Sequence, residues 1–426
     1  MMIAFNFNTF FIFILFLIDL SFASKSLVPR ALHGLRHSAA QQTHSLARDL
    51  RIAFSGILAS RADSNQNVVY CKPGKQVPFA AGASGNGNVT GPAGANTSGT
   101  SQRVTVTATK TGPSPTASSS PWKLISSYQG NSFFDGWDFF TDPDPTEGIV
   151  QYIDQNTAVT SGLLEINSQG NAVMRVETTP VVSGNRRSIR ITTQTQFTGG
   201  LVVMDSVHIP TGCGTWPAFW TNGPDWPAGG EIDIVEGVGD YTNDQATIHT
   251  NVGCTLSSST PSVLDISGSI VGGTNCAAQT TGNQGCGIRA ATNNSFGSGF
   301  NSNGGGVYAM KWDSTGIAVY FFPRGSEPGD ITARAPQPDS WGAALARWPA
   351  ASCDPFKFFT NHSAIFDTTL CGQWAGAVWD TAGIPGQEQS CAQRTGVSTC
   401  EAFVRANGAA MQEAYWEVKS VMIYQL

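Results

Sequence analysis

The sequence predicts an all-β domain built as a sandwich or a barrel. From residue 119 onward, short runs of alternating apolar and polar residues follow one another, as expected of strands with one buried face. Glycine, asparagine and aspartate separate these runs as turn residues. No long helical pattern interrupts them, although a short helix is expected near residues 402–407 and a long surface loop at the glycine-rich stretch 293–306. The clearest strand candidates are residues 188–193, 200–205, 246–251, 316–321 and 417–424.

Residues 1–23 have the pattern of a secretory signal peptide. Their apolar core covers residues 10–18, and the tripeptide Ser21-Phe22-Ala23 provides a cleavage site. A membrane anchor is the alternative, but this unbroken apolar run of nine residues is shorter than the ~20 residues that a spanning helix needs. We therefore expect a secreted, extracellular protein, free or associated with the cell wall, without membrane contact after cleavage.

Residues 24–118 differ in composition from the rest of the chain. They hold 10 Lys or Arg and 2 Asp or Glu, a net charge of +8, and are rich in Gly, Ser, Thr, Ala and Pro. Such a stretch cannot bury enough apolar surface to offset the entropy cost of ordering it. We expect a propeptide or a flexible, O-glycosylated linker. A small carbohydrate-binding module is the alternative, and the scarcity of aromatic residues between Phe54 and Ser118 argues against it.

Residues 119–426 carry the opposite charge, with 14 Lys or Arg against 27 Asp or Glu and a net charge of −13. Their length and strand pattern predict one large domain with its own core. An acidic domain without basic runs binds nucleic acid poorly, so we expect no nucleic-acid partner. We also expect a monomer.

Residues 231–236, with the sequence EIDIVE, place three carboxylates within one strand length. Glu231 and Asp233 share a face because strand side chains alternate, whereas Glu236 would point to the opposite face of a regular strand. A β-bulge at the adjacent apolar residues Ile234 and Val235 would absorb one residue and return Glu236 to the face of the other two. Ile232 and at least one of Ile234 and Val235 would then lie buried behind three aligned carboxylates. A calcium site and a solvated edge strand are the alternatives.

Such an arrangement has the chemistry of a retaining glycosidase. Two carboxyls about 5 Å apart can act together, one attacking the sugar and the other protonating the leaving oxygen. The charge of Asp233 between Glu231 and Glu236 would raise the proton affinity of at least one of them, as a general acid near neutral pH requires.

Tryptophans precede the carboxylates and a histidine follows them. Trp216, Trp220 and Trp226 could support the flat apolar faces of sugar rings. The alternative for Trp216 and Trp220 is a structural role in the core, because large rings are mostly buried. His249 lies in the next predicted strand. Near carboxylates, we expect it to orient one of them by a hydrogen bond.

Several of these segments resemble glycoside hydrolase family 16, and within it the fungal laminarinase branch, the endo-1,3(4)-β-glucanases. The matching segments are WPAFW (216–220), GGEIDIVEG (229–237), IHT (248–250), NGGGVYAM (303–310), VYFFPR (319–324) and CGQWAG (371–376). The likeness extends from about residue 122 to the C-terminus. It implies a jelly-roll β-sandwich, similar to concanavalin A, with a substrate cleft across its concave face.

The resemblance also assigns roles to individual residues. It implies that Glu231 is the nucleophile, Asp233 its assistant and Glu236 the acid/base. It implies that His249 contacts the catalytic carboxylates, and that no cofactor or metal takes part. The tryptophans that it implies to line the sugar cleft are Trp216, Trp220, Trp226 and Trp374.

The nine cysteines fit an oxidising compartment. Cys71 stands alone, and the eight that follow it could form four bridges in 105 ways. Nearness in sequence, together with the family resemblance, suggests the pairs Cys353–Cys371 and Cys391–Cys400. The sequons of a glycosylated secreted protein occur at Asn88, Asn96, Asn293 and Asn361.

The function that these features favour is endo-hydrolysis of β-1,3-glucans and mixed 1,3-1,4 glucans by double displacement, with the polysaccharide as the only partner. Two alternatives remain open. A cell-wall transglycosylase would use the same carboxylates and pass the sugar to another sugar. A lectin-like glucan-binding protein would share the fold, but such proteins commonly lack one or both glutamates.

Overall fold

The computed structural model describes residues 119–426. The predicted signal peptide (1–23), the predicted linker (24–118), Cys71 and the sequons at Asn88 and Asn96 lie outside the described residues.

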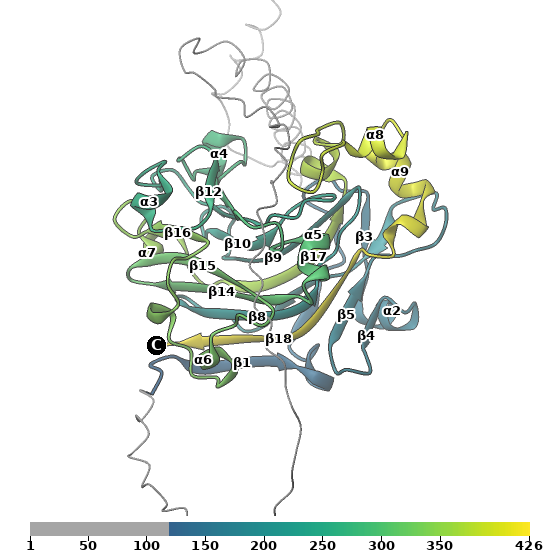
Figure 1. Cartoon of the computed structure of the whole chain (residues 1–426). Coiled ribbons are helices and arrows are strands. Elements are labelled where there is room, and N and C mark those ends of the chain that lie inside the picture. Colours follow the sequence, from purple (N-terminus) through teal and green to yellow (C-terminus); the bar gives the residue numbers. More distant parts are fainter. Residues whose placement is uncertain (1–118) are drawn as a thin grey trace, which may run out of the picture. The chain divides into compact units, whose positions relative to one another are not determined.

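Two antiparallel sheets of eight strands each form the scaffold (Figure 1). The first sheet has the order β16-β15-β14-β8-β18-β5-β4, and β1 also pairs with β18. Its strands are β16 (Ala346–Pro349), β15 (Gly316–Pro323), β14 (Gly306–Asp313), β8 (Gly200–His208), β18 (Tyr415–Gln425), β5 (Ala172–Arg175), β4 (Leu164–Ile166) and β1 (Lys123–Gln129).

The second sheet has the order β12-β13-β11-β10-β9-β17-β7-β2. Both sheets end at unpaired edge strands, so the domain is an open sandwich and no closed barrel. The strands of the second sheet are β12 (Ser269–Gly272), β13 (Cys286–Arg289), β11 (Gln245–His249), β10 (Glu231–Glu236), β9 (Thr215–Asn222), β17 (Ser363–Leu370), β7 (Arg190–Thr193) and β2 (Trp137–Phe139).

Short elements complete the described part of the chain. A separate parallel pair joins β3 (Val150–Tyr152) to β6 (Arg186–Ser188). The α-helices are α2 (Gln155–Thr160), α3 (Pro261–Leu264), α4 (Ala278–Thr281), α5 (Gly297–Ser302), α6 (Gly329–Thr332), α7 (Pro355–Phe358), α8 (Cys391–Thr395) and α9 (Cys400–Ala406). The 3-10 and π turns are η2 (Gly130–Ser132), η3 (Pro338–Ser340), η4 (Gly372–Gly376) and η5 (Gly408–Met411).

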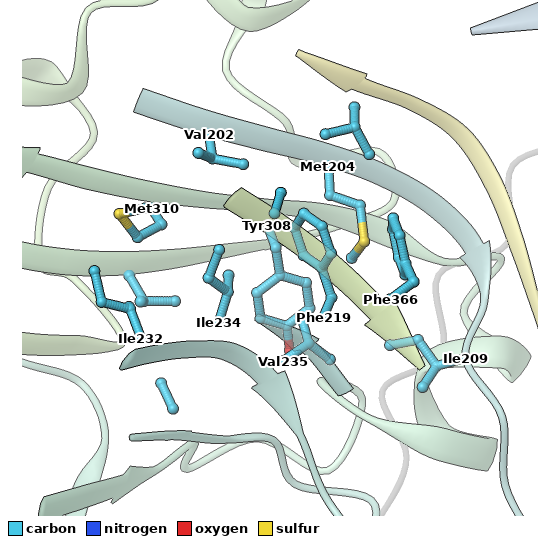
Figure 2. Packing of buried hydrophobic residues seen from close by; sticks show 14 of the residues in the cluster. Val202, Met204, Ile209, Phe219, Ile232, Ile234, Val235, Tyr308, Met310 and Phe366 are labelled. Atoms are coloured by element: carbon cyan, nitrogen blue, oxygen red, sulfur yellow. The ribbon is translucent and has the colours of Figure 1, made fainter. Parts of the chain in front are cut away.

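The core lies between the facing surfaces of the two sheets, as alternation along the strands predicts. Apolar side chains from both sheets meet there, and the Phe219 and Phe366 rings of the second sheet stack with centroids 4.4 Å apart. Figure 2 shows this packing, with Val202, Met204, Tyr308 and Met310 from the first sheet and Phe219, Ile232, Ile234, Val235 and Phe366 from the second.

Most sequence-based expectations for the elements are confirmed. The strands expected at 200–205, 246–251, 316–321 and 417–424 correspond to β8, β11, β15 and β18, and the short helix is α9. Residues 188–193 are divided instead between β6 and β7, because Ile189 belongs to neither strand. Within residues 119–426, no helix has the length and apolar character that a membrane crossing requires.

The prediction of a surface loop at 293–306 is wrong in part. The stretch contains α5 and begins β14, and Ser295, Phe296 and Phe300 are fully buried. Glycine content suggested an exposed loop, but Phe296 and Phe300 bury large rings in the main core. The segment therefore contributes three buried side chains to the interior, while other residues of it, such as Asn293 and Ser298, stay exposed.

The expected number of disulfides in this domain is confirmed, but the predicted pairs Cys353–Cys371 and Cys391–Cys400 are wrong. Three of the four bridges join cysteines that are 29 to 178 residues apart, so nearness in sequence did not identify them, whereas the fourth joins cysteines 10 residues apart. For example, Cys371 at the end of β17 bonds to Cys400 at the start of α9. The four bridges are Cys213–Cys391, Cys254–Cys353, Cys276–Cys286 and Cys371–Cys400.

Replacing Phe219 with alanine tests the contribution of the intersheet core. Phe219 is fully buried, so Phe219→Ala should lower the free energy of unfolding by about 3–5 kcal/mol, through lost burial and a residual cavity. Chemical denaturation followed by tryptophan fluorescence measures the change. Val252→Ala, at a side chain that is 64% exposed, is the control and should change stability by less than about 0.5 kcal/mol. Equal effects of the two variants would contradict this account of the core.

Candidate active site

Strand β10 contains the predicted bulge. Asp233 pairs with Trp220 on the neighbouring strand β9, but the next pair joins Val235 to Phe219. Ile234 is therefore the extra residue that β9 leaves unmatched. Both Ile234 and Val235 are fully buried in the intersheet core (Figure 2). The bulge thus sends two successive apolar side chains to the core side of one strand.

The bulge places the three carboxylates on one face of the second sheet. Directly paired residues of antiparallel strands point to the same side, and residues two apart in a strand share a face. The partners of the carboxylates on β9 are spaced by two, so all three carboxylates face away from the core. The pairs are Glu231 with Asn222, Asp233 with Trp220, and Glu236 with Ala218.

Two of the predicted tryptophans contact the two glutamates directly. The indole N–H of Trp216 donates to Glu236 Oε1 at 2.8 Å. The indole N–H of Trp226 donates to Glu231 Oε2. Trp216 is half-buried and Trp226 is 44% exposed, so neither is a core residue. Each glutamate therefore has a fixed donor beside it, in a site that remains open to solvent.

His249 lies on the opposite side of β10, in strand β11. It pairs with Glu231 in the antiparallel register. Its Nε2 is 3.3 Å from Asp233 Oδ2, and both side chains are buried. The prediction that His249 contacts one of these carboxylates is confirmed, and that carboxylate is Asp233.

Trp220 pairs with Asp233 across β9 and β10, and Trp374 packs against Trp216. The indole N–H of Trp220 donates to Asp367 Oδ2 at 3.1 Å, and the Arg190 guanidinium lies 5.1 Å from its ring centre. Trp374 belongs to the turn η4, which follows Cys371. Its ring stands nearly perpendicular to that of Trp216, with centroids 5.8 Å apart. Both rings are half-buried.

Asp367 and Arg190 were not among the predicted site residues. They pair with each other between β17 and β7, and Asp367 pairs with Ala218 on its other side. Arg190, Asp367, Ala218 and Glu236 therefore form one row across four strands of the carboxylate face. A lone aspartate in the apolar strand sequence SAIFDTTL is the signal that could have identified Asp367.

Burial and mutual repulsion keep protons on these carboxyls. Burial, followed by the charge of Asp233, raises the pKa of Glu231 to about 8. Burial also raises the pKa of Asp233 to about 8 and that of Asp367 to about 7. The pKa of Glu236 is raised well above its usual value, first by burial and then by the charge of Asp233. The cluster can therefore hold both protonated and ionised carboxyls near neutral pH.

The donor set is poorly suited to the alternative of a calcium site. The potential ligand atoms of Glu231, Asp233 and His249 lie within 4.8 Å of one another. Calcium takes about six to eight oxygen ligands, and this group offers two carboxylates and an imidazole nitrogen.

The raised pKa values predict how stability depends on pH. A carboxyl whose pKa is higher in the folded state stabilises the fold at low pH, and this contribution is lost as pH rises through the folded value. The free energy of unfolding should therefore fall between pH 5 and pH 9. Asp367→Asn removes one such group and should reduce that fall by an amount on the order of 1 kcal/mol.

Denaturant titrations at the two pH values measure this difference. Asp265→Asn, at a carboxyl that is 69% exposed, serves as the control and should leave the fall unchanged. If Asp367→Asn changes stability equally at both pH values, the account of a buried, protonated carboxyl is wrong.

Known proteins are similar to this chain in sequence and fold. Residues 137–424 match the family model described as the XgeA-like, catalytic GH16 domain. A Schizosaccharomyces pombe protein named a probable glycosidase is 42% identical over 317 residues, which cover 73% of this chain and 71% of the relative. The chain spans about half the length of the Aspergillus clavatus and Aspergillus niger proteins that it matches at 39% identity, which are named probable endo-1,3(4)-beta-glucanases.

Two solved structures are similar in fold and sequence. GH16 Laminarinase 16A from Phanerochaete chrysosporium, with beta-glucans in its donor and acceptor sites, has a TM-score of 0.64 and 35% identity, covering 71% of this chain and 99% of that one. An elongating GH family 16 beta-1,3-glucosyltransferase has the same TM-score and identity, covering 71% of this chain and 100% of that one. With the carboxylate motif, the jelly-roll sandwich and the family match in agreement, the chain belongs to glycoside hydrolase family 16, in its XgeA-like group.

Proposed function

We propose that the domain is a retaining endo-β-glucanase that hydrolyses β-1,3-glucans and mixed 1,3-1,4 glucans. The observation that carries this proposal is the bulge in β10, which brings Glu231 and Glu236 to one face of the sheet. Each glutamate accepts a hydrogen bond from a tryptophan that is also available to a sugar ring. A retaining glycosidase needs two such carboxyls on opposite sides of the scissile bond.

Glu231 is the nucleophile in this mechanism. Its carboxylate attacks the anomeric carbon and forms a covalent glycosyl-enzyme while the bond to the departing sugar breaks. The nucleophile must be ionised. Burial and Asp233 raise the pKa of Glu231 to about 8, and the charge of His249 and the Trp226 N–H, which donates to Glu231 Oε2, oppose this rise and favour the ionised form. Water later attacks the same carbon and releases Glu231.

Glu236 is the acid and then the base. Its pKa is raised well above the usual value by burial and by Asp233, so it can keep a proton to give to the departing oxygen. After that transfer it is ionised and accepts a proton from the attacking water. The Trp216 N–H fixes Glu236 Oε1 during both steps.

Asp233 and His249 support the two glutamates. Asp233 is buried between them in the strand and increases the proton affinity of both. His249 Nε2, 3.3 Å from Asp233 Oδ2, restrains this carboxyl. Asp233 therefore tunes the titration of the pair, and His249 holds Asp233 in place.

The cleft provides apolar platforms for glucose units. The four tryptophans Trp216, Trp220, Trp226 and Trp374 are half-buried or exposed. Sugar rings would stack on these faces, while Asp367 and Arg190 offer polar atoms beside Trp220. The names of the Aspergillus relatives and of Laminarinase 16A support β-1,3-glucan as the substrate class.

A second candidate function is transfer of the glycosyl unit to another sugar. The similar structure named as an elongating beta-1,3-glucosyltransferase favours this alternative. The same carboxylates serve both outcomes, since only the acceptor differs. A lectin-like role without catalysis is less favoured, because both glutamates are present and hydrogen-bonded.

The remaining parts of the proposal concern the cellular setting. We expect a secreted, extracellular monomer that needs no cofactor and binds no nucleic acid. Asn293 and Asn361 are exposed, as N-glycosylation requires, and glycosylation at both sites stays a prediction.

Replacing Glu231 with glutamine tests the nucleophile. Glu231→Gln should reduce the turnover of laminarin by at least about 1,000-fold, because an amide cannot form the glycosyl-enzyme. Binding of laminari-oligosaccharides should stay nearly intact. Reducing-end assays measure turnover, and isothermal titration calorimetry measures binding.

Glu165→Gln is the matched control and should leave turnover unchanged, because Glu165 lies on β4 of the other sheet and is 49% exposed. Unchanged turnover in Glu231→Gln would refute the assignment of the nucleophile.

A product analysis separates hydrolysis from transfer. The wild-type protein should release reducing ends from laminarin and lichenan and none from cellulose, since we propose activity on β-1,3 and mixed linkages. Hydrolysis of laminari-oligosaccharides should yield only shorter chains on chromatography. Products longer than the starting oligosaccharide would favour the transglycosylase, and glucan binding without any product would favour the lectin-like alternative.

A further inference from the structure

Asp244 lies beside the end of β10 and is fully buried. It immediately precedes β11, and its Oδ1 accepts a hydrogen bond from the backbone N–H of Glu236 at 2.9 Å. Burying a carboxyl is costly unless it makes compensating contacts. The burial of Asp244 is therefore tolerated because its carboxyl accepts this hydrogen bond.

The contact replaces one that the sheet does not provide. Pairing between β10 and β11 stops at Asp233 and Thr247, because the strands separate after the bulge. The backbone N–H of Glu236 would then lack an acceptor from β11, and a buried unpaired N–H is strongly unfavourable. The carboxyl of Asp244 supplies that acceptor at the residue where β10 ends.

Hydrogen bonds to buried groups hold the backbone of Asp244. Its backbone N–H donates to Ser295 Oγ at 3.0 Å, and its carbonyl accepts from the N–H of Ala290 at 2.8 Å. Ser295 is fully buried and in turn donates to Thr292 O at 2.8 Å. The hydroxyl of Tyr308, on β14 of the opposite sheet, donates to the carbonyl of Ser295.

The chain after Glu236 is held at a second point. Gly237 lies against Phe296, so closely that a Cβ on Gly237 would be 2.7 Å from the ring. Phe296 is fully buried next to Ser295. Ser295, which holds Asp244, and Phe296, which packs against Gly237, both belong to the segment 293–306. This segment therefore supports the end of β10.

Because the Asp244 carboxyl is neutral when protonated, asparagine is the conservative substitution for it. Burial raises its pKa well above the usual value, partly offset by backbone hydrogen bonds from Glu236 and Gln245. The titratable groups that interact with it are Asp233, on β10, and Tyr308. Since a protonated carboxyl is neutral, asparagine keeps its shape, its charge and its acceptor oxygen.

We propose that Asp244 is a positioning residue for Glu236. Its carboxyl fixes the backbone of Glu236 after the bulge and so directs that side chain toward the leaving oxygen of the substrate. Asp244 does not touch substrate; it acts through Glu236. The proposal rests on the proposed function, in which Glu236 is the acid/base.

Two substrates separate this role from a general structural one. Laminarin needs a proton on its leaving oxygen, whereas 2,4-dinitrophenyl β-laminaribioside has a leaving group that departs without one. Asp244→Ala should lower kcat on laminarin by about 10- to 100-fold. It should lower the rate of glycosyl-enzyme formation on the aryl glycoside, measured as the burst of 2,4-dinitrophenolate, by less than about 3-fold. In the pH–rate profile for laminarin, the apparent pKa of the alkaline limb should also shift.

Asp244→Asn should restore most of the laminarin activity, because it retains the acceptor for the Glu236 N–H. Ser298→Ala, at an exposed position of α5, is the control and should behave as the wild type. An equal loss on both substrates, no loss on laminarin, or a defect as large in Asp244→Asn as in Asp244→Ala would overturn the proposal.

A further variant keeps the test decisive if Asp244→Ala does not fold. Ser295→Ala removes the oxygen that holds the Asp244 N–H, and it should produce a smaller loss with the same preference for laminarin. A loss that is equal on both substrates would again overturn the proposal. Failure of the wild-type protein to cleave either substrate would instead refute the proposed function, so the two failures are distinguishable.

Discussion

The bulge at Ile234 is the constraint on which the rest of the site depends. A regular strand cannot present residues 231, 233 and 236 on one face, and it cannot bury Ile234 and Val235 together. The bulge achieves both, and packing in the intersheet core stabilises it because both apolar side chains are fully buried. Hydrophobic packing on one side of the sheet thus maintains the position of Glu236 on the other.

This arrangement has a local cost that other groups offset. Carboxyls at partly or fully buried positions of one strand raise one another's pKa values, and the bulge interrupts backbone pairing with β11. Fixed donors compensate for the charges, namely the indoles of Trp216 and Trp226. Asp244 compensates for the interrupted pairing. These contacts allow a destabilising cluster to persist in a stable sheet.

The sequence predicted the features that depend on local spacing. Strand alternation, the bulge in EIDIVE and the tryptophans near the glutamates can all be inferred within about 30 residues of chain. Asp367, Arg190 and three of the four disulfides depend on which strands become neighbours, and β17 joins the site from more than 100 residues away. Alternation predicts which face a residue occupies but not its neighbour across the sheet. The burial of Phe296 and Phe300 within 293–306 was not predicted for the same reason, since the glycines of this segment fit a loop and its partners are distant in sequence.

The support of Glu236 links the two sheets of the sandwich. Tyr308 belongs to the first sheet and contacts Ser295, which holds Asp244, which in turn holds the backbone of Glu236 on the second sheet. The Tyr308 ring also packs in the intersheet core (Figure 2). A shift of one sheet against the other would therefore move Glu236, whereas Glu231 lies before the bulge, where β10 pairs with both β9 and β11. Ordinary strand pairing thus positions Glu231, and packing across the two sheets positions Glu236.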